Sequence, residues 1–421
     1  MINIQKKIAD IYSMEQLAQA YRTEAELTRS YGNHALAFFG LAPENSHFLA
    51  PGEEGLVNYR LVRNVAVVLG DPVCAPEAFE RVTGSFLNFC ALQHWHVAFY
   101  QASPERLTTY RALKLRAFKM GEEAILHPQT FTLSGSTMAN VRVSARRAER
   151  DEVVIHWYEG VPPAEVIQQL EQISSAWLES KAGQYASEMG FSMGRLEELT
   201  NIADRAEMVG NISRSSHGPM RAVPRVVTAV ATTSAGKACA FVTFTPIYGC
   251  VPTEVTATGK PPEMPGTNPS LQRHCVSTAS PSAAMQGEGW GWSLDFMRRA
   301  PDAPPGVVEL LLVRAIERFR SGGAQIVSLG MVAMADTRQE MAPVERRLAS
   351  FVIDRLHLLE DRRTLFNFKQ KFHPQWESRY VVTNTTLALP KIVLAVLRLR
   401  NYYSGGRLAR LLTRLINRPR P

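Results

Sequence analysis

Hydrophobic positions along this chain follow two periods, which together predict a mixed α/β fold. Short apolar runs at 56–61 and 65–69 flank Arg63-Asn64 and predict a β-hairpin. The elements expected next are a helix near 76–93, a strand at 97–101, a helix from Pro104 to about 120, and a short strand at 124–126. We expect these elements to form a first domain over residues 1–148.

The pattern restarts after the charged run 142–152, which predicts a second domain over residues 149–386. Its expected elements are a strand at 153–158, a helix at 163–181, strands within 225–247, a helix at 307–320 ended by Gly322-Gly323, and a strand at 324–329. Residues 250–289 are rich in Pro, Ser, Thr and Gly and lack periodicity. We expect a flexible insertion there, with a functional lid as the alternative.

The C-terminal segment, residues 387–421, accounts for the net charge of the chain. The whole chain has 47 Lys+Arg, 39 Asp+Glu and a formal charge of +8, and this segment holds eight of the cations and no carboxylate. Leucines and an isoleucine recur at helical spacing over 408–416, between Arg407, Arg410, Arg414 and Arg418.

This basic amphipathic pattern predicts a membrane-contacting tail. Each cation gains about 1 kcal/mol near an anionic leaflet, and an apolar face adds to this. A helix packed on its own domain and a helix bound to RNA phosphates are the alternatives. The apolar run at 391–400 is too short to span a bilayer.

The N-terminus and the cysteines predict the compartment. No apolar signal core is present at the N-terminus, and the five cysteines form no CxxC pair. We therefore expect a cytoplasmic protein, attached peripherally to the inner face of the cell membrane. His94 and His96 could share one strand face, but no third ligand is near in sequence, so no metal and no cofactor is expected.

Two segments carry candidate chemistry. In the segment 366–382, Lys369, Lys371 and Arg379 alternate with aromatic residues, which suggests an anionic and partly apolar ligand. The alternative is a terminal strand whose lysines are solvated. The segment 293–299, SLDFMRR, places a carboxylate shortly before two guanidinium groups.

In that second segment, Asp295 precedes Arg298 and Arg299 by three and four residues. Such a set can supply a base and an anion clamp, although a local salt bridge is the simpler explanation.

Six short motifs occur in the order seen in aminoacyl-phosphatidylglycerol synthases, the catalytic domains of the multiple peptide resistance factor family. The chain resembles this family over about residues 25–385. The motifs are GDPV (70–73), KMGEEA (119–124), FSMGR (191–195), SLDFMRR (293–299), SLGM (328–331) and FKQKFHPQWESRYVV (368–382). Each motif is weak alone, but six in order are specific.

The resemblance implies two GNAT-like folds in tandem, each a mixed sheet flanked by helices. It implies transfer of a lysyl or alanyl group from aminoacyl-tRNA to the glycerol hydroxyl of phosphatidylglycerol, at the cytoplasmic membrane face. Asp295, Arg298, Lys369 and Lys371 match the family's catalytic positions. The weaker candidates for substrate binding are Arg195, Arg299 and Arg379.

Coenzyme A is not an expected partner. GNAT acyltransferases hold its pyrophosphate with backbone N–H groups of a glycine-rich loop. Here the corresponding loop contains Pro301, Pro304 and Pro305, which have no N–H to donate. Two alternatives to the implied function remain open: tRNA-dependent transfer to another lipid or small molecule, and a non-catalytic GNAT-like module that binds membrane or RNA.

Overall fold

The computed structural model describes residues 14–42, 44–182, 196, 226–248, 291–333 and 359–400. The expected insertion at 250–289, Arg195, and the tail arginines Arg407, Arg410, Arg414 and Arg418 lie outside these residues. No helix of the described ranges is long and apolar enough to cross a membrane.

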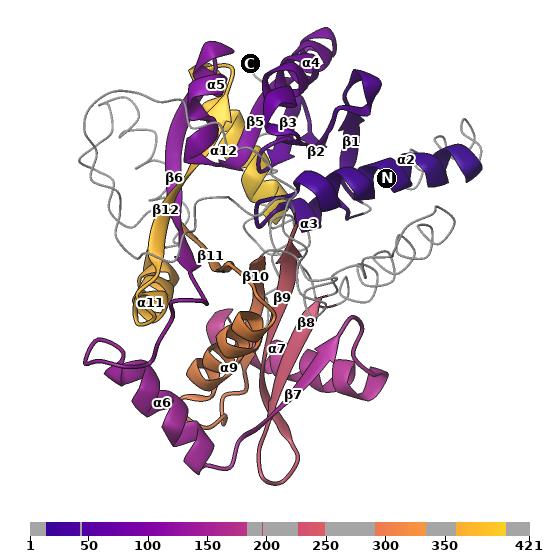
Figure 1. The fold of residues 1–421 in the computed structure, drawn as a ribbon. Coiled ribbons are helices and arrows are strands. Elements are labelled where there is room, and N and C mark those ends of the chain that lie inside the picture. Colours follow the sequence, from indigo (N-terminus) through magenta and orange to yellow (C-terminus); the bar gives the residue numbers. More distant parts are fainter. Residues whose placement is uncertain are drawn as a thin grey trace, which may run out of the picture.

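One twelve-stranded mixed sheet runs through the described part of the molecule (Figure 1). Its strand order is β1-β2-β3-β5-β12-β6-β11-β10-β9-β8-β7, with β4 paired to β2. The strands are β1 (Ser46–Leu49), β2 (Gly55–Val62), β3 (Val65–Leu69), β4 (Val73–Cys74), β5 (His96–Ala102), β6 (Arg116–Leu126), β7 (Val154–Glu159), β8 (Val227–Thr232), β9 (Ala238–Ile247), β10 (Gly291–Arg299), β11 (Ile326–Ala333) and β12 (Gln375–Thr383).

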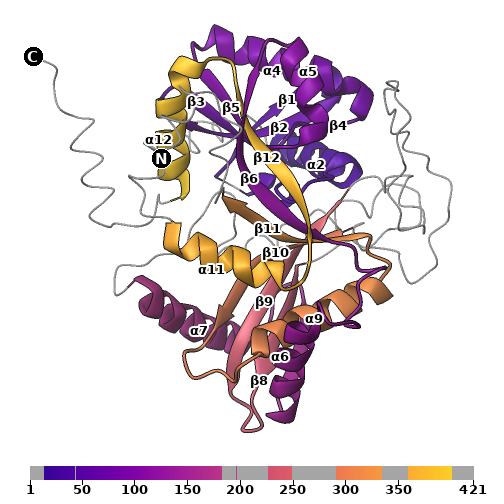
Figure 2. The same cartoon turned by 90° about the vertical axis from the view of Figure 1, so that its left-hand side faces the viewer.

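Helices cover both faces of this sheet, which confirms the predicted mixed α/β class (Figure 2). The helices of the first half are α2 (Met14–Tyr31), α3 (Ala37–Gly40), α4 (Phe79–Leu92) and α5 (Leu107–Ala112). The later helices are α6 (Ala139–Arg150), α7 (Ala164–Ala182), α9 (Val307–Ser321), α11 (Leu359–Gln370) and α12 (Leu389–Arg400).

The first half is built around the parallel pair β3–β5, which α4 connects. Strand β3 is apolar at every position because both of its faces are buried. Ala66 and Val68 pack with the aromatic residues of α4. Val65 and Val67 face the opposite way and pack with Ile392 and other residues of α12.

The second half repeats this unit as β10–α9–β11. The spacing of apolar residues on α9 buries Leu311, Leu312 and Phe319 against the sheet. Phe319 stacks on Trp292 of β10, with ring centroids 4.7 Å apart. Two parallel βαβ units therefore lie in one sheet.

Strands β6 and β12 join the two halves. Strand β12 comes from the end of the chain, yet it lies between β5 and β6 and pairs with both. Strand β6 lies between β12 and β11 and pairs with both, through residues 116–125 and 121–126 respectively. The sheet is therefore continuous across the boundary predicted at residue 148, because β6 precedes that residue and pairs with two strands that follow it. Helix α6, which contains residue 148, packs on α9.

Two local predictions are wrong. A helix was expected from Pro104 to about 120, but the helix ends at Ala112 and β6 begins at Arg116. The strand prevails because β12 pairs with β6 along residues 116–125. The alternative interpretation of residues 366–382, a terminal strand with solvated lysines, is also wrong for Lys369, which lies buried in the last turn of α11.

The first part of the predicted tail belongs to the folded core. Ile392, Ala395 and Leu399 of α12 are buried against the face of β3 that α4 does not cover. This is the self-packing alternative, realised for residues 389–400. Residues 401–421, which carry the four predicted membrane-binding arginines, lie outside the described structure.

Candidate active site

The parallel pair β10–β11 opens after three residue pairs. Gly291, Trp292 and Ser293 pair with residues 326–328, and no register pair links the rest of the two described strands. Strand β10 has a bulge between residues 294 and 297, where it stays with β9, and β11 has one between residues 328 and 331, where it stays with β6. Because bulges bend strands, β10 and β11 separate beyond Ser293 and Ser328, and we call this break in their pairing the opening.

Asp295 lies in the β10 bulge and is 8% exposed. The next backbone N–H, that of Phe296, donates a 3.0 Å hydrogen bond to Oγ1 of Thr243 on β9, which holds the bulge in place. The carboxylate therefore comes from a rigid part of the sheet, as a catalytic group requires.

Arg298 lies farther along β10 and packs against an aromatic ring of α7. Its guanidinium carbon lies 4.0 Å from the ring centroid of Trp177, and Nη1 donates to the carbonyl oxygen of Met297 at 3.3 Å. Such stacking orients the planar guanidinium group. The bulge interrupts the strand alternation between Asp295 and Arg298, so their spacing does not assign them to opposite faces.

Lys369 approaches the opening from α11. Its side chain is buried, and Nζ donates a 3.0 Å hydrogen bond to the carbonyl oxygen of Gly330 on β11. A Cβ atom built on Gly330 would lie 3.6 Å from Nζ and 3.8 Å from the carbonyl oxygen of Leu294 on β10. The ammonium group therefore lies where β10 and β11 separate.

The surroundings of Lys369 change its acidity. Burial lowers the pKa of Lys369 to about 8, and the carboxylate of Glu123 opposes this shift. The end of α11 is fixed on β12, because Trp376 donates a 2.7 Å hydrogen bond to Gln370 and stacks on Phe366. Lys369 is thus a buried, held cation rather than a solvated one.

A buried ion pair joins the strands beneath the opening. Arg379 of β12 donates from Nε to Oε2 of Glu123 on β6 at 2.6 Å, and from Nη2 to Glu377 at 3.1 Å. Ser328 of β11 donates to the other oxygen of Glu123 and accepts from the backbone N–H of Gly330 at 3.0 Å. The network therefore connects β6, β12 and β11 to the residue that Lys369 contacts.

The charges of this network stabilise one another. Burial by itself would raise the pKa of Glu123, but Arg379, followed by Ser328, produces a net lowering. The pKa of Arg379 is raised, because its two carboxylate partners outweigh burial. Both groups are therefore ionised at neutral pH.

Sequence reasoning placed Arg379 among substrate-binding candidates and missed Glu123, Ser328 and Glu377. All three lie in motifs quoted for the family resemblance, where polar residues interrupt β-forming runs. That interruption was the available signal. The pairing of Glu123 with Arg379 was not visible, because the two residues are 256 positions apart.

The other predicted residues lie apart from Lys369. Lys371 turns to α9, where Nζ lies 3.0 Å from Oε1 of Glu309. Arg299 is exposed at the far end of β10. Within the described residues, no group of three or more His, Cys, Asp or Glu side chains could hold a metal ion.

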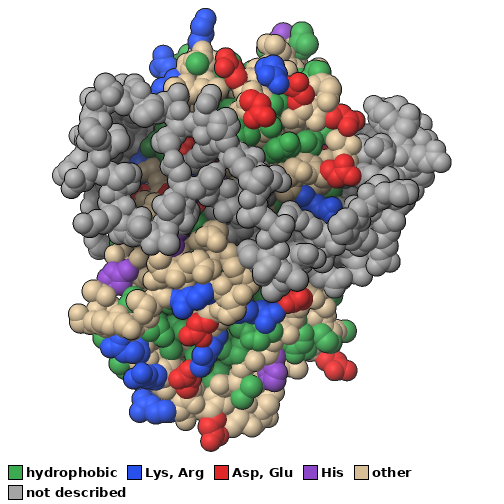
Figure 3. Space-filling view, viewed as in Figure 1, with side chains coloured by type: hydrophobic (Ala, Val, Ile, Leu, Met, Phe, Trp, Pro, Cys, Tyr) green, Lys and Arg blue, Asp and Glu red, His purple; other side chains and the backbone are tan. Residues whose placement is uncertain are grey.

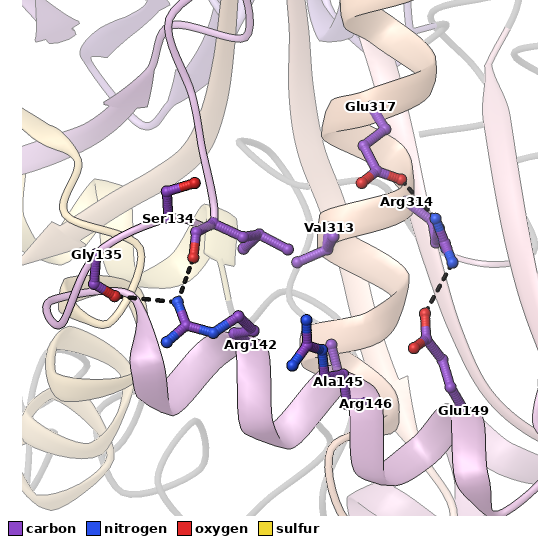
Figure 4. Close-up of a pocket in the computed structure, with 10 residues that line it drawn as sticks. Ser134, Gly135, Arg142, Ala145, Arg146, Glu149, Val313, Arg314 and Glu317 are labelled. Atoms are coloured by element: carbon purple, nitrogen blue, oxygen red, sulfur yellow. Dashed lines mark hydrogen bonds and ion pairs between the residues drawn. The ribbon is translucent and has the colours of Figure 1, made fainter.

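A basic surface cavity of about 470 Å³ lies between α6 and α9 (Figure 4). Arg142 donates from Nη1 to the carbonyl oxygens of Leu133 and, at 3.0 Å, Gly135. Across the cavity Arg314 bridges Glu149 and Glu317, at 2.7 and 2.8 Å. With four arginines and one glutamate in twelve residues, α6 presents a strongly cationic face.

Comparisons with known proteins place this chain in a family. The model of the family described as "Phosphatidylglycerol lysyltransferase, C-terminal" matches residues 25–256 and 277–383. A phosphatidylglycerol lysyltransferase of Bacillus subtilis is 25% identical over 369 residues, which are 87% of this chain and 35% of that protein. A lysylphosphatidylglycerol biosynthesis bifunctional protein LysX of a Mycobacterium species is 27% identical over 379 residues, 88% of this chain and 29% of that protein. The chain thus spans about a third of the curated relatives it matches.

Solved structures show the same fold. L-PGS from Bacillus licheniformis superposes with a TM-score of 0.68 at 23% identity, covering 91% of this chain and 97% of that one. The C-terminal domain of a putative lysylphosphatidylglycerol synthetase from Agrobacterium fabrum gives 0.63 at 22% identity, covering 92% and 98%.

Proposed function

Because this chain belongs to the family of phosphatidylglycerol lysyltransferase C-terminal domains, we propose that it transfers an aminoacyl group, lysyl or alanyl, from aminoacyl-tRNA to the glycerol hydroxyl of phosphatidylglycerol. The observation that carries this proposal is the opening between β10 and β11. A buried carboxylate, that of Asp295, and a buried ammonium group, that of Lys369, lie on the elements that border it.

The reaction is an ester exchange between two alcohols. The lipid hydroxyl attacks the carbonyl carbon of the aminoacyl ester, a new C–O bond forms, and the C–O bond to the tRNA ribose breaks. The proton lost by the lipid hydroxyl is returned to the ribose oxygen. The donor ester is already activated, so the protein has to orient both substrates, move this proton and stabilise an oxyanion.

The described residues fit these tasks. Asp295 accepts or orients the hydroxyl proton from the rigid bulge of β10. Lys369 places a positive charge at the opening, where negative charge develops on the carbonyl oxygen. Arg298, oriented by Trp177, binds the lipid phosphate or the phosphate of the tRNA acceptor end.

The basic face of α6 supports a nucleic acid as donor. Its four arginines follow one another on a single short helix, and the Arg142 side chain borders an open cavity. Clustered arginines bind phosphates and release counterions. Helix α6 also contacts the start of α9, because Gly306 packs against the backbone of Ser144. The first turn of α9 then contacts Lys371 through Glu309.

Attachment to the inner face of the cell membrane is part of the proposal. Arg407, Arg410, Arg414 and Arg418 provide the charge for it in the sequence of the tail. Truncation after residue 400 is expected to weaken binding to anionic vesicles and to remove part of its salt dependence. A truncated chain that binds as the full chain does would refute this role of the tail.

The function is tested with purified protein, vesicles containing phosphatidylglycerol, and lysyl-tRNA or alanyl-tRNA labelled in the amino acid. We expect label in aminoacylated phosphatidylglycerol, identified by mass spectrometry, with one of the two donors. Discharge of the tRNA without a labelled lipid would favour a different acceptor. If neither donor is discharged while vesicles or RNA are bound, the chain is a binding module.

A further inference from the structure

Four loops meet at one end of the first half of the sheet. Strands β3 and β5 are parallel and start together, with Val65 opposite His96. Strand β12 ends there and β6 begins there, since Thr383 pairs with Ala98 and with Arg116. The hairpin turn 62–65 and the loops 91–96, 112–116 and 383–391 therefore share one end of the molecule, at the top in Figure 1.

Large apolar side chains are exposed at this end. Leu387 is 89% exposed, Leu92 is 79% exposed and Leu61 is 41% exposed. A single exposed leucine needs no explanation. Leu61 lies near the end of β2, Leu92 ends α4 and Leu387 lies in the connection between β12 and α12, so these apolar tips gather at one end of the sheet.

Cations surround these tips. The four loops contain Arg63, Lys114, Arg116 and Lys391 and no Asp or Glu. Figure 3 shows Lys, Arg, His and hydrophobic side chains along the uppermost edge of this view, with Asp and Glu side chains just below them. The pKa of Arg398 is lowered by burial and then by Arg63, so the end of α12 also lies near the hairpin turn.

The backbone gives a separate reason to regard these side chains as functional. Arg63, His94 and Lys114 have φ angles of 57°, 55° and 61°. Glycine adopts this left-handed conformation without the steric cost that a side chain incurs. Three neighbouring loops thus keep a cation or an imidazole where a glycine would be less strained, which points to a role for the side chains.

We propose that this surface, which we call the basic end, docks the protein on an anionic lipid surface. The basic end consists of Leu61, Arg63, Leu92, His94, Lys114, Arg116, Leu387 and Lys391. Its cations match the negative charge of the headgroups, and its leucines enter the boundary between headgroups and acyl chains. This inference rests on the proposed function only in that the acceptor is a membrane lipid.

The position of the basic end fits this role. Arg379, beneath the opening, lies four residues along β12 from Thr383 at the basic end, which is about 13 Å of strand. The cationic face of α6 lies at the opposite end of the molecule (Figure 2), so membrane and tRNA can be bound at the same time.

The test is sedimentation of the full chain with vesicles, in the absence of tRNA. Arg63→Gln with Lys114→Gln is expected to lower partition to phosphatidylglycerol-containing vesicles about 25-fold, at about fivefold for each cation, and to make binding less sensitive to salt. Leu92→Asp with Leu387→Asp is expected to lower it at least about tenfold. The matched control is Val143→Asp with Val154→Asp, two exposed apolar residues of the second half, which should bind as the unmodified chain does.

Circular dichroism and thermal melting check that each variant is folded. Equal partition of all variants would overturn the proposal, and so would equal binding to vesicles of phosphatidylcholine alone. If the unmodified chain is a dimer that the leucine variant dissociates while vesicle binding is retained, the basic end contacts a second copy instead. Absence of transfer with intact vesicle binding would overturn the proposed function and leave this inference standing.

Discussion

Each half of this molecule contains two parallel strands connected through a helix, but one pair stays hydrogen-bonded and the other separates. In the first half, β3 and β5 stay paired over residues 65–69 and 96–100, and Gly70 adds a further 2.8 Å hydrogen bond to Tyr100. In the second half, β10 and β11 pair over three residues and then separate. The closed pair is apolar on both faces, whereas the open pair is bordered by Asp295, Ser328 and Lys369.

This difference shows which kind of βαβ unit can carry an active site. In a closed pair, the backbone N–H and C=O groups are hydrogen-bonded between the strands, and the side chains are packed in the core. Both strands of the open pair carry a bulge, and a bulge interrupts the ladder and can re-aim the side chains beside it. The buried network of Glu123 and Arg379 ties β11 to β6 and β12, on the side of β11 away from β10.

The largest effect is expected from removing the carboxylate at the open pair. Asp295→Asn should lower the transfer rate about 10³-fold, because general acid–base groups contribute about 10²–10⁴-fold. The rate is measured under single-turnover conditions with excess protein. Asp302→Asn is the matched control, since Asp302 is exposed and pairs only with Lys237 among its described contacts. Full activity of Asp295→Asn would show that the open pair is not the active site.

Breaking the network beneath the open pair should affect stability. Arg379→Met leaves the carboxylate of Glu123 buried without its cation, which is expected to cost about 3 kcal/mol or more of unfolding free energy. Arg81→Met removes the cation of the exposed pair with Glu54 and should leave urea unfolding unchanged. Equal unfolding midpoints for the two variants would mean that the network does not brace the sheet.

Removing the cation at the opening should lower the rate and change its pH dependence. Lys369→Met is expected to slow transfer about 10²-fold. In the unmodified chain the rate should fall as the pH rises through about 8, because Lys369 loses its proton there. Glu123 raises the pKa of Lys369, so Glu123→Gln should move this decline to lower pH.

The pH profile separates this role from a structural one. A Glu123→Gln variant that is folded, slower and unshifted in its profile would contradict the electrostatic link to Lys369. Asp302→Asn should show the same pH dependence of the transfer rate as the unmodified chain.

The smallest effects are expected from alanine substitutions at the two glycines that follow the paired residues of β3 and β11. Gly70 and Gly330 both have positive φ, 73° and 82°, so alanine costs about 1 kcal/mol at either position. Gly70→Ala also places its Cβ atom 2.4 Å from the ring of His34, so it should destabilise more. Gly330→Ala has no contact under 3.6 Å but adds a methyl group beside Lys369, so it should change the transfer rate instead. The opposite ranking in thermal melts and rates would contradict the comparison.

Much of the local structure could be predicted from the sequence. The apolar runs at 65–69 and 97–101 are strands, and the 3.6-residue period at 307–320 is a helix, because burial on a regular element imposes its own spacing. The prediction failed at 104–120, where a helical pattern gives way to β6. There, hydrogen bonds to β12 from the far end of the chain outweigh local preference.

Residue types and their spacing were enough to predict the mixed α/β class, the family through its ordered motifs, and the concentration of eight cations in residues 387–421. These properties depend on residue type and on spacing along the chain. The fold was needed to show that β12 lies between β5 and β6, that Glu123 contacts Arg379, and that Lys369 is buried at the opening while Lys371 turns away. Strand pairing is set by contacts between distant segments, and local periodicity carries no information about which segments those are.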